Sequence, residues 1–333
     1  MRSGSTLCGM VLGWHADSFY VYEPLWRQAR WTYWYGNSTV CRSDTSECRQ
    51  VEAGKAPTDK GFTDNVGNSQ GCSLVRAKLI LSKIYDCLFN DFENAVYSEL
   101  TVAKLGGPSW FGVGSCLKKR RPAKYCIHQY APKTCKAKLH RVTKVLRLTV
   151  DNFEYLLKGR DNVKVIHLFR DPRAIINSRI ETKWYKTSKS IIENAKSLCH
   201  KMLKDYHEGL QLLMNYKEKF RFLYYEDLND NPFKKVEILY KYVGMSLDPA
   251  KYKSIQKLPV FSEQKASSTR ESNTAFWWRK SLDWEIVKGV DTVCSEVYEV
   301  LGYKVFDSEE NMRDLTISSV DIPSLFRLDA DGF

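Results

Sequence analysis

The segment Arg2-Ser3-Gly4-Ser5-Thr6 has the residue types of a loop that binds an anionic group. A glycine among small residues lets successive backbone N–H groups turn toward one anion, and a following helix adds the positive end of its dipole. Apolar residues recur at spacings of three and four over residues 7–14, which predicts such a helix. Taken alone, the segment is equally consistent with a simple helix cap formed by its serine or threonine.

Glu23 is a candidate general base. It follows the β-prone run Phe19-Tyr20-Val21-Tyr22 and precedes Pro24, so we expect it at the end of a short strand. A carboxylate at that position, near the anion-binding loop, can accept a proton from a reacting hydroxyl. The alternative is a structural glutamate that pairs with Arg2 or caps a turn.

Arg170 and Ser178 are candidates for holding a phosphate. Arg170 ends the β-branched run 163–169, and the Asp171-Pro172 pair is typical of a helix start. Ser178 lies about two helical turns further on, so the helix can direct both side chains toward one phosphate. The alternative is that Arg170 and Arg173 are surface charges that pair with Asp171.

The elements around these residues alternate between strand and helix. Strands are predicted over 19–22, 142–148, 163–169 and 220–225, and helices over 75–92, from 152, through 191–206 and over 232–243. This alternation predicts an α/β fold with an open parallel sheet and helices on both faces, whose ligands bind at the carboxyl ends of the strands. We expect one domain over residues 1–306, irregular cysteine-bearing insertions at about 36–72 and 104–140, and a loosely held polar tail over 307–333.

Charge and cysteine content narrow the function classes. The net charge of +12, from 51 Lys and Arg against 39 Asp and Glu, favours a polyanionic partner such as nucleic acid, an anionic membrane or an acidic polysaccharide. The ten cysteines include no C-x-x-C pair, so disulfides in an oxidising compartment are favoured over a zinc site. The sequon Asn37-Ser38-Thr39 agrees with a secretory lumen. The pairing of the cysteines stays open.

Taken in order, these motifs resemble those of the Golgi carbohydrate sulfotransferases, in particular the enzymes that sulfate the 6-hydroxyl of galactose, N-acetylgalactosamine or N-acetylglucosamine. The loop at 2–6 resembles the family's loop for the 5'-phosphosulfate of 3'-phosphoadenosine 5'-phosphosulfate, and the segment 19–26 resembles its next signature. The segment 165–173, continuing to Ser178-Arg179, is similar to its 3'-phosphate motif. Two later blocks also resemble the family: Tyr224-Tyr225-Glu226-Asp227-Leu228, and Ser268-Thr269-Arg270 through Trp278-Arg279.

The resemblance implies a P-loop-like fold, the nucleotide co-substrate named above and no metal. It implies Glu23 as base and Arg2 as the catalytic group that offsets charge on the bridging oxygen. The residues that it implies for binding the donor are Arg2, Ser3, Gly4, Ser5, Thr6, Arg170, Ser178 and Arg270. Other side chains are weaker candidates for the general base or for contacts with the donor or the acceptor. They are His15, His167, Lys144, Arg147, Tyr22, Trp26, Trp277, Trp278 and the run 118–121.

The predicted function is therefore transfer of a sulfuryl group to a sugar 6-hydroxyl of a glycosaminoglycan or glycoprotein glycan in the Golgi lumen, with no nucleic acid partner. An inactive sulfotransferase-like remnant and a basic glycosaminoglycan-binding module are the alternatives. A P-loop kinase is disfavoured because no lysine follows the glycine at the spacing of that motif. The family has a membrane anchor and stem before its first strand, and Met1 leaves room for neither, so we expect a chain shortened at its N-terminus and lacking that strand.

Overall fold

The computed structural model describes residues 4–26, 32–42, 47–51, 73–90, 92, 96, 97, 100, 107–183, 188–230, 232–247 and 275–327. The chain divides into two units, which we call the N-terminal unit (Ser5–Arg42 and Glu47–Asn152) and the C-terminal unit (Met1–Gly4, Ser43–Ser46 and Phe153–Phe333). No helix in the described part of the chain is both long enough and apolar enough to span a lipid bilayer.

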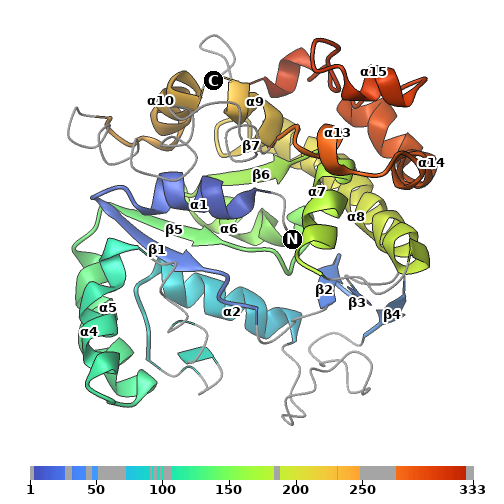
Figure 1. Cartoon of the computed structure of the whole chain (residues 1–333). Helices are drawn as coiled ribbons and strands as arrows, with labels where there is room; N and C mark the ends of the chain where they lie inside the picture. The colour runs from blue at the N-terminus through green and yellow to red at the C-terminus, as the bar shows by residue number, and fades with distance from the viewer. Residues whose placement is uncertain are drawn as a thin grey trace. The chain divides into compact units, whose positions relative to one another are not determined.

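The N-terminal unit is built around a parallel pair of strands. Its helices and strands are α1 (Ser5–Gly13), β1 (Ser18–Tyr22), β2 (Thr32–Tyr35), β3 (Thr39–Arg42), β4 (Cys48–Gln50), α2 (Leu74–Tyr85), η2 (Pro108–Trp110), α4 (Phe111–Lys118), α5 (Ala123–Lys136), β5 (His140–Lys144) and η3 (Val150–Phe153). Strands β1 and β5 are parallel, with Ser18 opposite His140 and Tyr22 opposite Lys144 (Figure 1). Strands β2, β3 and β4 form an antiparallel sheet in that order.

Two glycines let helix α1 lie directly on strand β1. A Cβ atom added at Gly9 or at Gly13 would lie 2.2 Å from an atom of the Tyr20 side chain. The two positions are four residues apart and therefore share one face of the helix. Tyr20 is fully buried, so the helix that follows the predicted anion-binding loop is fixed against the strand that precedes Glu23.

The structure corrects the prediction of irregular insertions. Within 36–72, residues 39–42 and 48–50 are strands, and the rest of that segment beyond Val51 lies outside the described residues. Within 104–140, residues 108–118 and 123–136 are helical, and α5 buries Cys126, Ile127, Ala131 and Cys135 on one face. Their spacing of one and four residues is the period of an amphipathic helix. Basic residues on the other positions obscured that period in the sequence.

The C-terminal unit contains a second parallel pair and most of the long helices. Its elements are α6 (Glu154–Gly159), β6 (Val165–Phe169), α7 (Pro172–Glu181), α8 (Ser188–Asn215), β7 (Phe220–Tyr224), α9 (Tyr225–Asp230), α10 (Pro232–Val243), α13 (Trp278–Ser281), α14 (Trp284–Leu301), α15 (Glu309–Arg313) and η5 (Ser324–Phe326). Strands β6 and β7 are parallel, with Val165 opposite Phe220 and Phe169 opposite Tyr224. The helix predicted over 232–243 is confirmed with the same bounds.

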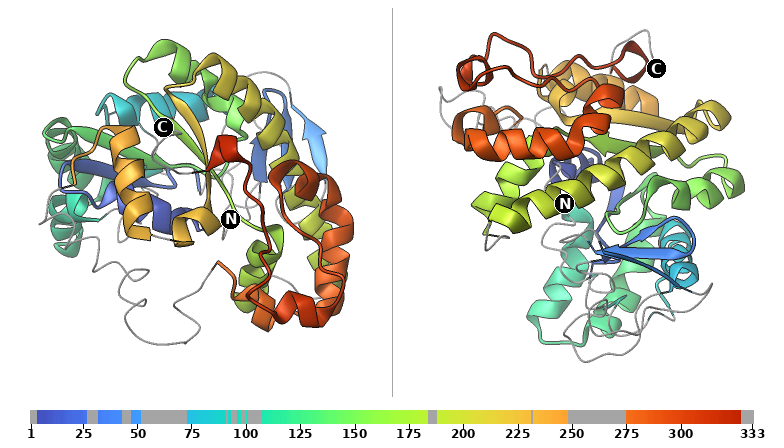
Figure 2. Two further views of the ribbon diagram at one scale, coloured as in Figure 1. Left: turned by 90° about the horizontal axis from the view of Figure 1, so that it is seen from above. Right: turned by 90° about the vertical axis from the view of Figure 1, so that its right-hand side faces the viewer.

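Each unit contains at least one disulfide, which confirms the prediction that the cysteines pair. The four bonds are Cys41–Cys48, Cys87–Cys135, Cys116–Cys126 and Cys199–Cys294. The last one joins α8 to α14, which run side by side in Figure 2. Among the cysteines that the structure describes, Cys8 alone is outside a disulfide, and burial raises the pKa of its thiol to about 12.

The polar C-terminal segment is packed, contrary to the prediction of a loosely held tail. Helix α15 buries Met312, and Phe326 packs on the Phe222 ring with a centroid distance of 4.9 Å. The buried Arg279 guanidinium donates to the carbonyl oxygens of Met312 at 2.7 Å and Ile317 at 2.7 Å. A single buried cation therefore satisfies the backbone of a segment that has few apolar residues of its own.

Candidate functional site

Strand register places Glu23 and Lys144 at the same edge of the N-terminal unit. Tyr22 is opposite Lys144 in the parallel pair, so Glu23 directly follows the carboxyl end of β1. The Glu23 N–H donates to the Lys144 carbonyl at 3.0 Å. Glu23 has a φ of 42°, in the left-handed region that side chains other than glycine rarely adopt. Such backbone conformations cluster at functional positions.

Four side chains, which we call the Glu23 cluster, meet at this edge: Thr6, Glu23, Lys144 and Arg147. The Lys144 ammonium donates to Glu23 Oε1 at 2.7 Å and to Thr6 Oγ1 at 3.1 Å. The Arg147 Nη2 atom lies 4.0 Å from Glu23 Oε2. Burial lowers the pKa of Lys144, and the neighbouring Glu23 carboxylate opposes that shift. One lysine therefore links the start of α1 to the candidate base.

Glu23 has two described partners that the sequence did not suggest, Lys144 and Arg147. Both expectations, a general base or a glutamate paired with Arg2, put the carboxylate near the loop at 2–6. The structure pairs it with Lys144, which also lies 4.3 Å from the centroid of the Tyr22 ring. Arg2 and Ser3 lie outside the described residues. A buried carboxylate held between two cations is oriented by them, and its charge is compensated where water is excluded.

A second group lies at the carboxyl edge of β6 and β7 in the C-terminal unit. Phe169 is opposite Tyr224, so Arg170 and Tyr225 follow the two strands side by side. The Arg170 guanidinium carbon lies 4.5 Å from the centroid of the Tyr225 ring. Gly4 has a φ of 78°, and a Cβ atom added there would lie 2.1 Å from Tyr225 Cδ2. The glycine of the front loop and the arginine of the predicted 3'-phosphate motif therefore contact the same ring.

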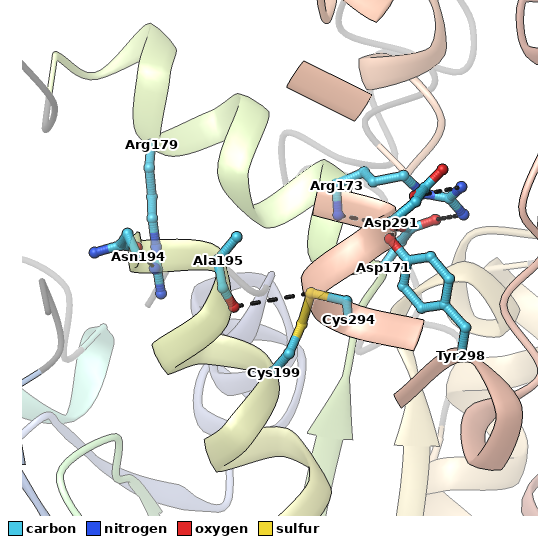
Figure 3. The surroundings of a disulfide bond; sticks show 9 residues. All are labelled: Asp171, Arg173, Arg179, Asn194, Ala195, Cys199, Asp291, Cys294 and Tyr298. Atoms are coloured by element: carbon cyan, nitrogen blue, oxygen red, sulfur yellow. Dashed lines mark hydrogen bonds and ion pairs between the residues drawn. A yellow bond between two sulfur atoms is a disulfide. The ribbon is translucent and has the colours of Figure 1, made fainter. Parts of the chain in front are cut away.

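A buried network behind Arg170 holds the turn that presents it. Glu226 Oε1 accepts from the Asp171 N–H at 2.9 Å, and the Asp171 carboxylate caps α7 and accepts from Arg173 Nη2 at 2.9 Å. Arg173 also reaches Asp291 Oδ1 at 3.4 Å (Figure 3). Burial and the Asp171 charge raise the pKa of Glu226 to about 7. The alternative that Arg173 is a surface charge paired with Asp171 is confirmed in the pairing and wrong in the exposure, because the side chain is fully buried.

The other predicted site residues are placed as follows. Ser5 and Thr6 open helix α1, and Ser178 is half-buried on α7. Arg179, next to Ser178, is buried and donates to Asn194 Oδ1. Arg270 lies outside the described residues, as do Ser268 and Thr269. Of the residues predicted to hold the 3'-phosphate, the structure therefore describes Arg170 and Ser178.

Several of the weaker candidates have structural partners. His15 Nδ1 accepts from the Asp17 N–H at 3.1 Å, and desolvation lowers the pKa of His167 to about 4. Trp278 is fully buried beneath the Arg173 guanidinium, whose central carbon lies 4.3 Å from the ring centroid. Trp277 donates from Nε1 to Glu181 Oε1 at 3.1 Å. Across the described residues, no three His, Cys, Asp or Glu side chains converge as a metal site would require.

Two features of these groups were not predicted from the sequence. The first is the Lys144 bridge between Thr6 and Glu23, whose partners are 138 and 121 residues away in the chain. The second is the buried Glu226, which belongs to a motif that resembled the family but was given no role. A carboxylate directly after a buried strand was the available signal, since the ends of parallel strands meet at one edge.

Comparison with known proteins identifies the class. Residues 131–302 match the sulfotransferase domain, which covers more than half of the chain. The chain therefore belongs to the sulfotransferase family, whose domain has a P-loop-like α/β fold, and it is a sulfotransferase.

Among the proteins to which the chain is similar are several carbohydrate sulfotransferases. The chain is 28% identical to carbohydrate sulfotransferase 1 of Homo sapiens over 352 residues, which cover 96% of this chain and 81% of the relative. It is 24% identical to carbohydrate sulfotransferase 5 of Homo sapiens, with 96% and 79% covered, and 23% identical to carbohydrate sulfotransferase 3 of Mus musculus, with 95% and 69% covered.

Proposed function

We propose that this sulfotransferase acts on carbohydrate, transferring the sulfuryl group of 3'-phosphoadenosine 5'-phosphosulfate to a sugar 6-hydroxyl of a glycan in the Golgi lumen. Its catalytic domain would span residues 1–306. The observation that carries the proposal is the position of Lys144, whose ammonium contacts both Glu23 at 2.7 Å and Thr6 at 3.1 Å. The names of the relatives support the carbohydrate acceptor.

The residues present fit the donor. A phosphate loop needs backbone that approaches closely, and at Gly4 a side chain has no room because of Tyr225. Gly4, Ser5 and Thr6 would hold the phosphosulfate end together with Arg2 and Ser3. Arg170, backed by the Tyr225 ring, would hold the 3'-phosphate with Ser178, and Arg270 would assist. The donor supplies an activated sulfuryl group, and no metal is required of the protein.

The chain's own groups have separate roles in the transfer. A bond forms between the sugar oxygen and sulfur, and the bond between sulfur and the bridging phosphate oxygen breaks with its electron pair going to the phosphate. Glu23 accepts the proton of the sugar hydroxyl. Lys144 and Arg2 compensate negative charge where it develops, as preorganised cations do in phosphoryl transfer. Lys144 also fixes the orientation of Glu23.

The test is transfer of radiolabelled sulfate from the donor nucleotide to a panel of desulfated glycans. The change Glu23→Gln removes the proton acceptor and keeps the side-chain shape, so we expect transfer to fall by about 10²- to 10⁴-fold with donor binding retained. The change Arg170→Met should instead weaken binding of adenosine 3',5'-bisphosphate by about tenfold or more.

Glu237→Gln is the matched control, because Glu237 is exposed on α10 and undergoes the same chemical change. It should retain full transfer. Nucleotide binding without transfer to any glycan would contradict the proposal and favour an inactive remnant. Glycan binding without nucleotide binding would favour a carbohydrate-binding module.

A further inference from the structure

The positive charge of the protein is concentrated in one segment. Residues 100–150 contain twelve Lys and Arg and no Asp or Glu. The chain as a whole has 51 Lys and Arg, so 39 lie elsewhere, which equals the total of 39 Asp and Glu. This single segment therefore accounts for the net charge of +12, and the remainder of the chain is neutral.

Most of these charges lie on the helical hairpin α4–α5. Seven of them are solvent-exposed: Lys118, Lys119, Arg120, Arg121, Lys124, Lys133 and Lys136. None of the seven forms an ion pair with a carboxylate in the part of the chain that the structure describes. Lys144 and Arg147, in contrast, are buried at Glu23. The exposed set is therefore free to contact an anion in solution.

Disulfides hold this hairpin in a fixed form. Cys116 on α4 is bonded to Cys126 on α5, which closes the basic turn at 118–121 between them. Cys135, near the end of α5, is bonded to Cys87. A turn that is already ordered loses little conformational entropy when a ligand binds, so its charges are presented at low cost.

One face of α5 continues the basic surface. Tyr125, Gln129, Lys133 and Lys136 are exposed at spacings of four, four and three, so they lie on one side of the helix. Tyr125 is 53% exposed and provides an aromatic surface among the cations. The helix spans about 21 Å. A surface of this length suits an extended chain of anionic groups better than a single small anion.

We propose that the hairpin α4–α5 is a binding surface for an acidic polysaccharide, whose sulfate or carboxylate groups contact the seven exposed cations. The chain enters β5 at His140, at the amino end of that strand, while the Glu23 cluster lies at its carboxyl end at Lys144. The end of α5 therefore leads to the edge of β5 opposite the Glu23 cluster. Binding of the polysaccharide requires no sulfate donor and so does not depend on the proposed function. Only the role of the polysaccharide as the sulfate acceptor rests on that function.

Other polyanions fit less well. Four disulfides mark an oxidising compartment, where nucleic acids are not the expected partner. A helix that binds a membrane surface inserts its apolar face into the lipid. The apolar face of α5 is instead buried within the unit, through Cys126, Ile127, Ala131 and Cys135. What α5 exposes is polar and basic.

The test compares two variants of the full chain that lose the same charge. In the first, the four basic residues at 118–121 are changed to glutamine. The control carries four equivalent changes at exposed positions outside the hairpin: Lys196→Gln, Lys217→Gln, Lys241→Gln and Lys280→Gln. Binding of chondroitin sulfate is measured over a range of salt concentrations, with uncharged dextran as the reference. We expect the hairpin variant to bind about tenfold more weakly at ~0.1 M salt and with a shallower salt dependence, because fewer counterions are released.

Equal weakening in the control would overturn the proposal, because net charge rather than the hairpin would then determine binding. Tighter binding to phosphatidylserine vesicles than to chondroitin sulfate would also overturn it. Sulfate transfer to a short uncharged oligosaccharide is measured separately for the unmodified protein and for both variants. Failure of that transfer in the unmodified protein argues against the proposed function and leaves the binding comparison intact.

Discussion

Glu226 offers the sharpest test of the site's electrostatics, through the change Glu226→Gln. Its Oε1 atom accepts the Asp171 N–H, and among the described residues its buried Oε2 atom has no hydrogen-bond partner. Glutamine keeps the accepting oxygen and replaces the protonated Oε2 with an NH₂ group of similar size. The variant therefore mimics the neutral acid at every pH and removes only the ability to ionise.

The size and sign of the effect follow from the pKa. Burial, with the Asp171 charge, raises the pKa of Glu226 from 4.5 to about 7. The unfolded chain therefore releases this proton at lower pH than the folded protein does. As a result, the free energy of unfolding falls as pH rises from 4.5 to about 7. At about 1.4 kcal/mol for each pKa unit, the loss amounts to about 3 kcal/mol. The stabilisation of the folded protein by protonated Glu226 is therefore fully present below pH ~4.5 and absent above about pH 7.

Urea unfolding followed by tryptophan fluorescence measures this effect between pH ~4.5 and ~8. We expect the variant and the unmodified protein to be equally stable at the acidic end and the variant to be more stable by about 3 kcal/mol at the alkaline end. The control Glu237→Gln, at an exposed position, should differ from the unmodified protein by under about 0.5 kcal/mol at every pH. A difference for Glu226→Gln that is constant with pH, or of opposite sign, would refute the reasoning.

Two further predictions concern the contacts at the site. Lys144→Gln leaves the buried Glu23 carboxylate without its 2.7 Å partner, so we expect a loss of about 3 to 5 kcal/mol in urea unfolding, largely recovered when Glu23→Gln is added; a loss below about 1 kcal/mol would show that the pair is solvated. Gly4→Ala places a Cβ 2.1 Å from Tyr225 Cδ2 at a positive φ, so binding of adenosine 3',5'-bisphosphate should weaken by about tenfold or more. Gly114→Ala, where an added Cβ meets nothing within 4 Å, should leave nucleotide binding unchanged.

Local signals in the sequence predicted the parts of the fold that local physics determines. Asp171 followed by Pro172 marked the start of α7, and the structure shows the Asp171 carboxylate accepting the Arg173 N–H at 2.9 Å. The β-branched run 163–169 contains β6, and the predicted helix at 232–243 is α10. In each case the residues that define the element lie within one or two turns of one another.

The sequence did not predict features that depend on distant partners. The sequence left open that Arg173 is a surface charge paired with Asp171; that pair forms, but the side chain is buried and also contacts Asp291, which is 118 residues away. The hairpin at 108–136 was expected to be irregular because its basic residues dominate the composition, whereas Cys87 stabilises it from outside the segment. The packed C-terminal segment depends on Arg279, 33 residues before Met312. None of these partners is visible in a local sequence pattern.

The sequence separations of the disulfides also bear on how the chain matures in the cell. Cys116 and Cys126 are 10 residues apart in the sequence. Cys199 and its partner Cys294 are 95 residues apart, so Cys199 is synthesised well before it can pair. Closing a short loop is faster and loses less chain entropy than closing a long one. We therefore expect the basic hairpin to be locked during synthesis, while Cys199 stays reduced until α14 has emerged. In this interval Cys199 is available for mispairing, and any wrong bond that it forms must be exchanged before Cys199 can pair with Cys294.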